Sequence, residues 1–339
     1  MVPAATTRET GMTSTTPWTG LGCACLLACV MGQAQAAPAF SASATIEGLS
    51  YRLVDLDEND GIAPTLTFIE TADGVLGTRV QANRSNFVGR GTAVSSVVKD
   101  LVGDAILSDS VGGVVLLDGA SATAAKRADG LSSTVDASAQ EATAWLDPAG
   151  VQNHISFDGA LFYVGSSASS NYGPYFQLSP NTQLVIDGVL KGSVALDPYA
   201  FAGTRTDAVQ QDLGVGLGVY GGASANFYIR TFADPDNRSV TTFFDGASLS
   251  TGTSAGLAPD GSVVASQPLT VAEERAFHIQ ITNANSASVL GSINSAAQSY
   301  GALRLDTSQV TPAVPEPSTW MLMGLGVALM GWRVRNQSA

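Results

Sequence analysis

Residues 252–256, Gly-Thr-Ser-Ala-Gly, match the G-x-S-x-G pattern that places a nucleophilic serine in many hydrolases. That pattern works when a strand precedes the serine and a helix follows it. Here the flanking residues are Ser, Thr, Gly and Ala, and the Pro-Asp-Gly that follows predicts a turn. The sequence has two histidines to serve as the base, His154 and His278, and His278 is expected on the polar face of a strand. We therefore expect no serine hydrolase and no enzyme.

A second short pattern lies at residues 216–221, where Gly-Leu-Gly-Val-Tyr-Gly matches G-x-G-x-x-G. In a dinucleotide site this motif opens a helix whose N-terminus binds the pyrophosphate. No helix pattern follows here, and the alternation of apolar residues with glycine instead predicts a strand with one bare face. We expect no dinucleotide cofactor.

Four oxygen-bearing side chains within six residues, Asp55, Asp57, Asn59 and Asp60, could gather a hard cation such as Ca²⁺. The order is not that of an EF-hand loop. Asp60 stands where that loop needs glycine, and Leu66 stands where it needs a bidentate glutamate. We expect a solvated hairpin loop and no cofactor, with Ca²⁺ as the alternative.

Tyrosine and tryptophan side chains could form a face on which sugar rings stack. The candidates are Tyr163, Tyr172, Tyr175, Tyr220 and Trp145. Their spacing does not show that they converge, and a scatter of core and edge aromatics accounts for them equally well. Carbohydrate binding is therefore the alternative function, not the first.

Charge excludes one class of partner. The body between the two end segments described below holds 27 acidic and 13 basic residues, a net charge of about −14. Such a surface repels phosphate backbones, so we expect no nucleic-acid binding. Carboxylates are numerous, yet no pattern identifies two that face each other as glycoside hydrolysis requires.

The amino terminus carries an export signal. Residues 21–31 are an apolar run, and Ala34-Gln35-Ala36 supplies a small-x-small site for signal peptidase, with cleavage before Ala37. Residues 1–36 are therefore expected to be a signal peptide. All the cysteines, Cys23, Cys25 and Cys29, lie in it, so the mature chain has no thiol for disulfides, metals or catalysis. Because residues 26–29 also fit a loose lipobox, lipidation of Cys29 is the alternative.

The composition and pattern of the body, residues 37–312, favour one all-β domain, with two smaller domains as the alternative. Alternating segments joined by Gly, Asn and Pro turns, without a long amphipathic helix, favour an antiparallel β-sandwich of jelly-roll type. The expected strands are residues 45–53, 65–68, 95–102, 111–117, 154–158, 161–164, 175–178, 184–196, 213–231, 240–244, 277–282 and 286–293. For residues 95–102 a helical turn is the alternative.

Several local features make that prediction specific. The loop at residues 55–61 is expected to join its flanking strands as a hairpin, and Pro180 and Asn181 predict a turn. Gly221-Gly222 is expected to fold the segment 213–231 back on itself. Residues 119–140 are expected to be an irregular connection or an outer strand.

The carboxyl terminus predicts a short transmembrane helix. Residues 320–332 are uncharged and apolar, with Trp320 and Trp332 at the interfaces. A helix of that length covers only about 20 Å of a hydrocarbon core of roughly 30 Å. Arg333 and Arg335 should stay cytoplasmic, which leaves the body outside.

Pro315-Glu316-Pro317 precedes this helix, and the prolines keep the chain extended and open to an enzyme. The order of Pro-Glu-Pro, apolar helix and terminal arginine resembles the PEP-CTERM sorting signal of Gram-negative bacteria, with residues 313–339 as the signal and anchor. An ordinary membrane anchor is the alternative.

The resemblance implies an exosortase-type membrane protease as a partner. It implies an exported protein that is transiently anchored in the inner membrane and then passed to the cell surface or the extracellular matrix. It also implies a link to exopolysaccharide and biofilm, so a non-enzymatic matrix protein is the preferred function. A carbohydrate-binding module with the same sorting signal is the alternative.

Overall fold

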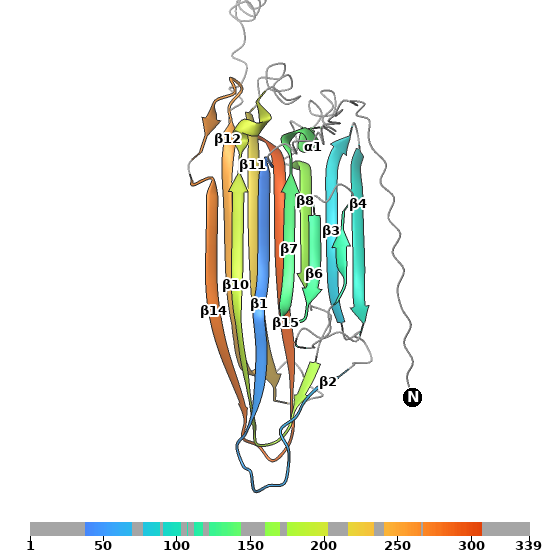
Figure 1. Cartoon of the computed structure of the whole chain (residues 1–339), viewed down its shortest axis with the longest axis vertical. Helices are drawn as coiled ribbons and strands as arrows, with labels where there is room; N and C mark the ends of the chain where they lie inside the picture. The colour runs from blue at the N-terminus through green and yellow to red at the C-terminus, as the bar shows by residue number, and fades with distance from the viewer. Residues whose placement is uncertain are drawn as a thin grey trace, which may run out of the picture. The chain divides into compact units, whose positions relative to one another are not determined.

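Alternating apolar and polar residues form long antiparallel strands in this protein. The computed structural model describes residues 38–69, 77–88, 91–102, 107, 112–117, 122–143, 160–169, 175–202, 216–233, 241–265 and 267–306. Within these ranges two sheets pack face to face, and the only helices are the short α1 (Ala139–Thr143) and η1 (Pro198–Phe201) (Figure 1). The predicted all-β antiparallel class is confirmed, while the jelly-roll connectivity stays a prediction.

One sheet has six strands. Its order is β14 (Thr270–Asn283), β10 (Thr182–Leu196), β1 (Phe40–Asp55), β7 (Gly130–Ala137), β6 (Ala122–Arg127) and β5 (Val114–Leu116). Strand β10 shows why the sheet forms, because Leu184, Ile186 and Leu190 are buried on its inner face while Asp187 and Lys191 point outward. That alternation with a period of two fixes which face of the strand is buried.

The other sheet has nine strands. Seven follow the order β13 (Val263–Val264), β12 (Thr241–Leu257), β11 (Gly216–Phe232), β15 (Val289–Asp306), β8 (Ala160–Ser169), β3 (Gly77–Val88) and β4 (Gly91–Val102). Two short strands complete it, since β9 (Tyr175–Leu178) pairs with the start of β15 and β2 (Leu66–Ile69) pairs with β9. All pairs are antiparallel.

Large rings from one sheet pack against small residues of the other. The ring of Phe40 in β1 lies over Gly301 of β15, where a Cβ atom would overlap it. Phe40 also contacts Phe162 of β8 with 6.0 Å between ring centroids, and Phe227 of β11 stacks on Phe277 of β14 at 5.2 Å. The core therefore depends on close interdigitation across the two sheets.

Three buried serines add a polar contact to this core. Ser133 of β7 meets Ser166 of β8 and Ser299 of β15, and its Oγ lies 2.6 Å from the Ser299 Oγ. The Ser133 hydroxyl also donates to the carbonyl oxygen of Ser166 at 2.9 Å, and the Ser166 hydroxyl donates to that of Thr123 at 2.7 Å. Because each of these buried hydroxyls has a partner in the opposite sheet, the cluster favours one alignment of the sheets.

The predicted hairpin at residues 55–61 is wrong. Strand β1 pairs with β10 and β7 in one sheet, while β2 pairs with β9 in the other, so the loop crosses from sheet to sheet. It is held at both ends, where Leu56 N donates to Asn181 O at 2.8 Å and Thr65 N donates to Ser179 Oγ at 2.7 Å. Its composition predicts a turn correctly, but the strand that follows the loop pairs with β9 in the other sheet and not with β1.

The predicted reversal at Gly221-Gly222 is also wrong. Strand β11 runs straight through both residues, paired with β12 and β15. Gly221 faces the core beneath Val194 of β10, and a Cβ atom there would overlap that side chain. The glycine is thus required by packing between the sheets and does not mark a turn.

Of three other predictions about local structure, two are confirmed and one is wrong. Residues 95–102 do form a strand, within β4. The turn at Pro180 and Asn181 is confirmed, with Asn181 at a φ of 48°. Residues 119–140 are not an outer element, because β7 lies between β1 and β6 inside its sheet.

The expected strand 277–282 lies within β14, and the expected strands 240–244 and 286–293 overlap β12 and β15. Residue 240 is outside the described residues, and β15 begins only at Val289, after the turn. The expected strand 154–158, the leader 1–36 and the apolar segment 320–332 lie outside the described residues. Among the helices that the structure describes, none has the length and apolar character needed to cross a bilayer.

Replacing Gly301 with alanine should destabilise the protein by about 1–3 kcal/mol, since the added methyl overlaps the fully buried ring of Phe40. Urea unfolding of the full-length chain measures this. Gly256→Ala is the matched control, because its Cβ would meet its neighbours only at ordinary distances of 3.5 Å and beyond. Equal stability of the two variants would contradict the interdigitated core.

Replacing Asn181 with glycine should raise the pKa of Asp60. In the native protein the Asn181 amide donates to Asp60 Oδ2 at 2.7 Å, and this bond, followed by one from Ile62 N, holds the pKa of Asp60 below its ordinary value of 3.8. A depressed folded pKa stabilises the fold above pH 3.8, and that stabilisation is lost as the pH falls through the folded pKa. Glycine is the replacement because it can adopt the positive φ of 48° that Asn181 has in the turn.

NMR titration of the carboxyl resonances tests this prediction. Asp260 is the internal control, because Ser262 lowers its pKa independently of Asn181. An unchanged Asp60 titration in Asn181→Gly would contradict the assigned cause.

Candidate functional site

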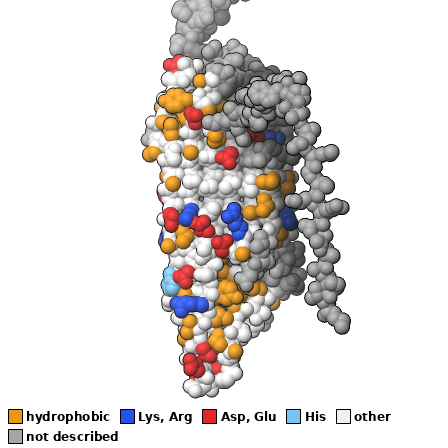
Figure 2. Space-filling view, viewed as in Figure 1, with side chains coloured by type: hydrophobic (Ala, Val, Ile, Leu, Met, Phe, Trp, Pro, Cys, Tyr) orange, Lys and Arg blue, Asp and Glu red, His pale blue; other side chains and the backbone are white. Residues whose placement is uncertain are grey.

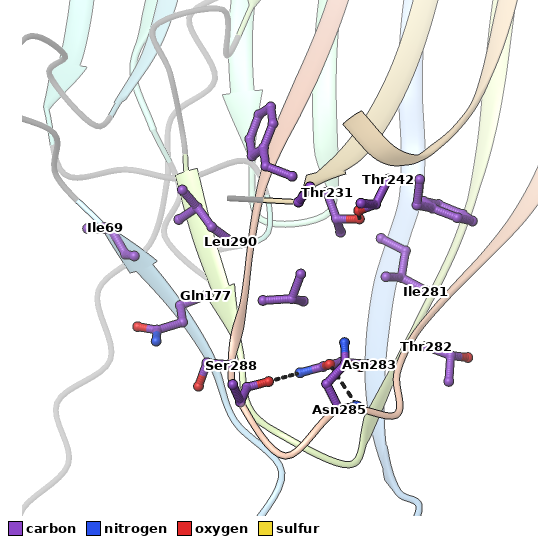
Figure 3. A pocket seen from close by; sticks show the side chains of 15 residues that line it. Ile69, Gln177, Thr231, Thr242, Ile281, Thr282, Asn283, Asn285, Ser288 and Leu290 are labelled. Carbon is purple, nitrogen blue, oxygen red and sulfur yellow. Dashed lines mark hydrogen bonds between the residues drawn. The ribbon is translucent and has the colours of Figure 1, made fainter. Parts of the chain in front are cut away.

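A pocket of about 660 Å³ opens at the end of the sandwich where β14 turns into β15 (Figure 3). We call it the end pocket. None of its described lining residues is charged. They are Ile69, Gln177, Thr231, Phe232, Ala233, Thr242, Phe243, Ile281, Thr282, Asn283, Asn285, Ala287, Ser288, Val289 and Leu290. Its described lining offers hydroxyl and amide groups that can hydrogen bond to a ligand, beside apolar side chains that can pack against one.

Asn283 is the most buried polar residue of the end pocket, and its side chain stabilises the turn between β14 and β15. Its amide donates to the carbonyl oxygens of Leu178 at 3.3 Å, Ser179 at 2.8 Å and Ala287 at 3.0 Å, and its side-chain oxygen accepts from Asn285 N. With 1% of its surface exposed, it ties β9 to the β14–β15 turn. Its conformation is therefore fixed by the fold and is not free to adapt to a ligand.

A smaller groove of about 290 Å³ lies beside this end, on the outer face of the nine-stranded sheet. We call it the aromatic groove. Its described lining residues are Tyr175, Tyr228, Ile229, Arg230, Phe244, Ser292, Ile293 and Asn294. Phe244 and Tyr228 stack with ring centroids 5.7 Å apart and planes 18° apart, and Phe244 is 64% exposed. The groove thus presents a flat apolar surface to solvent.

Glycine at position 246 shapes that surface. Gly246 of β12 stands opposite Tyr228 of β11, and a Cβ atom there would overlap the Tyr228 ring. Because position 246 has no side chain, the Tyr228 ring can pack over the backbone of β12 and stack on Phe244.

Arg230 is the one charged side chain among the described residues of the aromatic groove. Its Nε donates to Ser292 Oγ at 2.8 Å, and its guanidinium carbon lies 5.1 Å from the centroid of the Phe232 ring. These two contacts hold the guanidinium in place beside the aromatic pair.

A second aromatic cluster lies further along the same face. Tyr163 of β8 and Tyr300 of β15 stack at 6.2 Å, and Arg304 lies 5.3 Å from the centroid of the Tyr220 ring. Burial, and then the neighbouring Tyr300, raises the pKa of Tyr163. The nine-stranded sheet thus carries two groups of rings on its outer surface.

Three of the five aromatic candidates from the sequence do share one face. Tyr163, Tyr175 and Tyr220 all lie on the outer face of the nine-stranded sheet. Tyr172 and Trp145 lie outside the described residues. The sequence analysis missed Tyr228, Phe244, Arg230 and Tyr300. Tyr228 and Arg230 could have been found from their spacing, because residues 220, 228 and 230 lie on the same face of one continuous strand. The expected reversal at Gly221-Gly222 would have broken that strand, so the shared face was not recognised.

The cation candidates bind their own backbone. Asp55 Oδ1 accepts from Asp57 N at 2.9 Å, Asp57 Oδ1 accepts from Asn59 N at 3.2 Å, and Asp60 Oδ1 accepts from Ile62 N at 2.7 Å. In the described part of the chain, no three His, Cys, Asp or Glu side chains come together in a way that could hold a metal ion. Calcium at this loop stays a prediction.

The serine and histidine candidates lie on different sheets. Ser254 is in β12 and faces outward opposite Tyr220, while His278 lies on the outer face of the six-stranded sheet. His278 Nδ1 is 2.6 Å from Asp187 Oδ1, and its Nε2 is 2.6 Å from Gln280 Nε2. His154 lies outside the described residues. The structure therefore does not bring Ser254 and His278 together.

The outer face of the six-stranded sheet carries paired charges. Lys191 lies between Glu47 and Glu274, and hydrogen bonding to Glu47 is the main cause that raises the pKa of Lys191. Figure 2 shows acidic and basic side chains side by side across the middle of this face, surrounded by neutral polar atoms. The nine-stranded sheet carries an outer ion pair as well, between Arg79 of β3 and Asp100 of β4, but the two groups of rings described above lie on its face alone.

Comparison with known proteins identifies one segment. Residues 313–336 match the PEP-CTERM protein-sorting motif. They include Pro315, Glu316 and Pro317, which lie outside the described residues together with the predicted anchor residues Trp320, Trp332, Arg333 and Arg335 and the predicted cleavage residues Ala34, Ala36 and Ala37. No curated protein matches the chain. The recognisable feature of this chain is therefore its C-terminal PEP-CTERM sorting motif.

Proposed function

We propose that this chain is an exported, non-enzymatic protein that an exosortase-type membrane protease recognises through its C-terminal motif. The observation that carries the proposal is the match of residues 313–336 to the PEP-CTERM protein-sorting motif. Signal peptidase first removes the leader before Ala37. The apolar segment then holds the chain in the inner membrane until the exosortase-type protease acts near Pro315-Glu316-Pro317.

The entry and exit points of the sandwich support this order of events. Strand β1 begins at Phe40, whose ring packs on Gly301, close to the end of β15 at Asp306. The chain thus enters and leaves the sandwich at the same end. From Asp306 to Pro315 the chain can span at most about 30 Å, so this end faces the membrane while the protein is anchored.

The end pocket then lies far from the membrane. Strand β15 runs from Val289 beside the pocket to Asp306, and at about 3.4 Å per residue it spans roughly 55–60 Å. The end pocket and the aromatic groove are therefore presented outward, where a partner in the extracellular matrix can reach them. We propose exopolysaccharide as that partner and a role in the biofilm matrix.

A carbohydrate-binding module with the same sorting motif is the second candidate. It is favoured by the gathering of Tyr163, Tyr175 and Tyr220 on one outer face, since sugar-binding sheets present flat rings in this way. The neutral, hydroxyl-rich end pocket is compatible with it.

Replacing the sorting residues should block processing. In a host with an exosortase, we expect the full-length chain carrying Pro315→Ala, Glu316→Gln and Pro317→Ala to accumulate uncleaved in the inner membrane. The native chain should instead appear shortened at the cell surface or in the medium. Fractionation and immunoblotting with an antibody against the sandwich measure both forms.

Pro312→Ala is the matched control, because it removes a nearby proline that lies outside the motif. It should be processed like the native chain. Equal processing of the triple variant and the control would contradict recognition through Pro-Glu-Pro.

A further inference from the structure

We propose that the aromatic groove binds an acidic polysaccharide, with sugar rings on Phe244 and Tyr228 and a sugar carboxylate on Arg230. The proposal rests on the carbohydrate-binding function above, and it adds the site and the class of sugar.

The exposed ring of Phe244 is the first argument. A phenylalanine that is 64% exposed near the start of a long strand leaves a large apolar face in water. Its partner Tyr228 extends that face, because the two rings are nearly parallel at 5.7 Å. Such a surface is covered when the C–H face of a sugar ring lies on it, while the sugar hydroxyls stay in contact with water.

The placement of Arg230 is the second argument. A guanidinium binds a carboxylate through two parallel hydrogen bonds, and it does so best when its own position is already fixed. Ser292 and the ring of Phe232 fix it here. Within the described part of the chain, Arg230 makes no ion pair with a carboxylate. Its charge is therefore available to an anionic ligand.

Charge selects the ligand class. The whole chain carries a net charge of −13, so it repels polyanions except where a positive group stands locally without a paired acid. The aromatic groove is such a place, and its remaining polar residues, Ser292 and Asn294, can hydrogen bond to sugar hydroxyls. A nucleic acid would meet the repulsion of the rest of the surface, whereas a uronic-acid polymer has fewer charges per unit length and flat apolar ring faces.

The surface between the two aromatic clusters suits a polymer. From Tyr228 to Tyr220 along β11 is roughly 25 Å, and both rings point outward. The outward side chains between them include the polar Ser224, Asn226 and Gln298, and the ring of Tyr300 lies over Gly222. An extended chain that begins in the groove would therefore pass over polar side chains and then meet a further ring, that of Tyr300, which is 42% exposed.

Calorimetric titration of the full-length chain in detergent with polygalacturonate tests the proposal. We expect binding that weakens roughly tenfold or more in Phe244→Ala and in Arg230→Gln, since each loses a stacking surface or a charged hydrogen bond. Methyl-esterified polygalacturonate, which lacks the charge, should bind correspondingly less.

Two matched controls separate the groove from general surface effects. Tyr199→Ala removes a ring that is 65% exposed in η1, and Arg52→Gln removes a cation from β1 in the other sheet. Both should bind like the native chain. Circular dichroism melting establishes that every variant is folded.

The outcomes are distinguishable. Equal binding of the ester and the acid would overturn the acidic class and leave carbohydrate binding intact. Equal losses in the groove variants and the controls would overturn the site. Absence of binding by the folded native chain to both polymers and to a neutral glycan array would overturn this inference together with the carbohydrate-binding function, while the sorting proposal is judged separately by processing.

Discussion

The close approach of the two sheets is the constraint on which the rest of the structure depends. No thiol lies in the predicted mature chain, so packing and hydrogen bonds hold the sheets together without disulfides. Phe40 fits against the bare backbone of Gly301, and Phe227 stacks on Phe277 across the interface. Ser133 adds a buried hydroxyl that is satisfied only by the opposite sheet. A shift of one sheet over the other would disrupt all these contacts at once.

That packing also fixes the functional surfaces. Because side chains alternate along each strand, burial of Phe227 and Ile229 in β11 places Tyr228 and Arg230 on the outside. The same rule gives the six-stranded sheet its outer ion pairs, such as the one between Lys191 and Glu47. The six-stranded sheet thus presents paired charges around Lys191, whereas the nine-stranded sheet presents rings and the Arg230 guanidinium in the aromatic groove.

Local pattern predicted much of this fold and little of the site. Alternation identified the strand that became β10, and proline with asparagine identified the turn at Asn181, because both signals depend on neighbouring residues. The turn predicted at Gly221 was wrong, because glycine is needed there to leave room for the Val194 side chain of the other sheet. The grouping of Tyr228 with Phe244 depends on strand register, which no local pattern contains. The sorting motif was predictable in full since it is a contiguous stretch of sequence.

The central claim is that the C-terminal motif directs export and processing of this sandwich. Intact-mass measurement of the protein recovered from the cell surface or the medium tests it most directly. The account predicts a product that begins at Ala37 and ends near Pro315-Glu316-Pro317, so that the segment containing Trp320 and Arg335 is missing. A mature product whose mass includes Arg335 would contradict it.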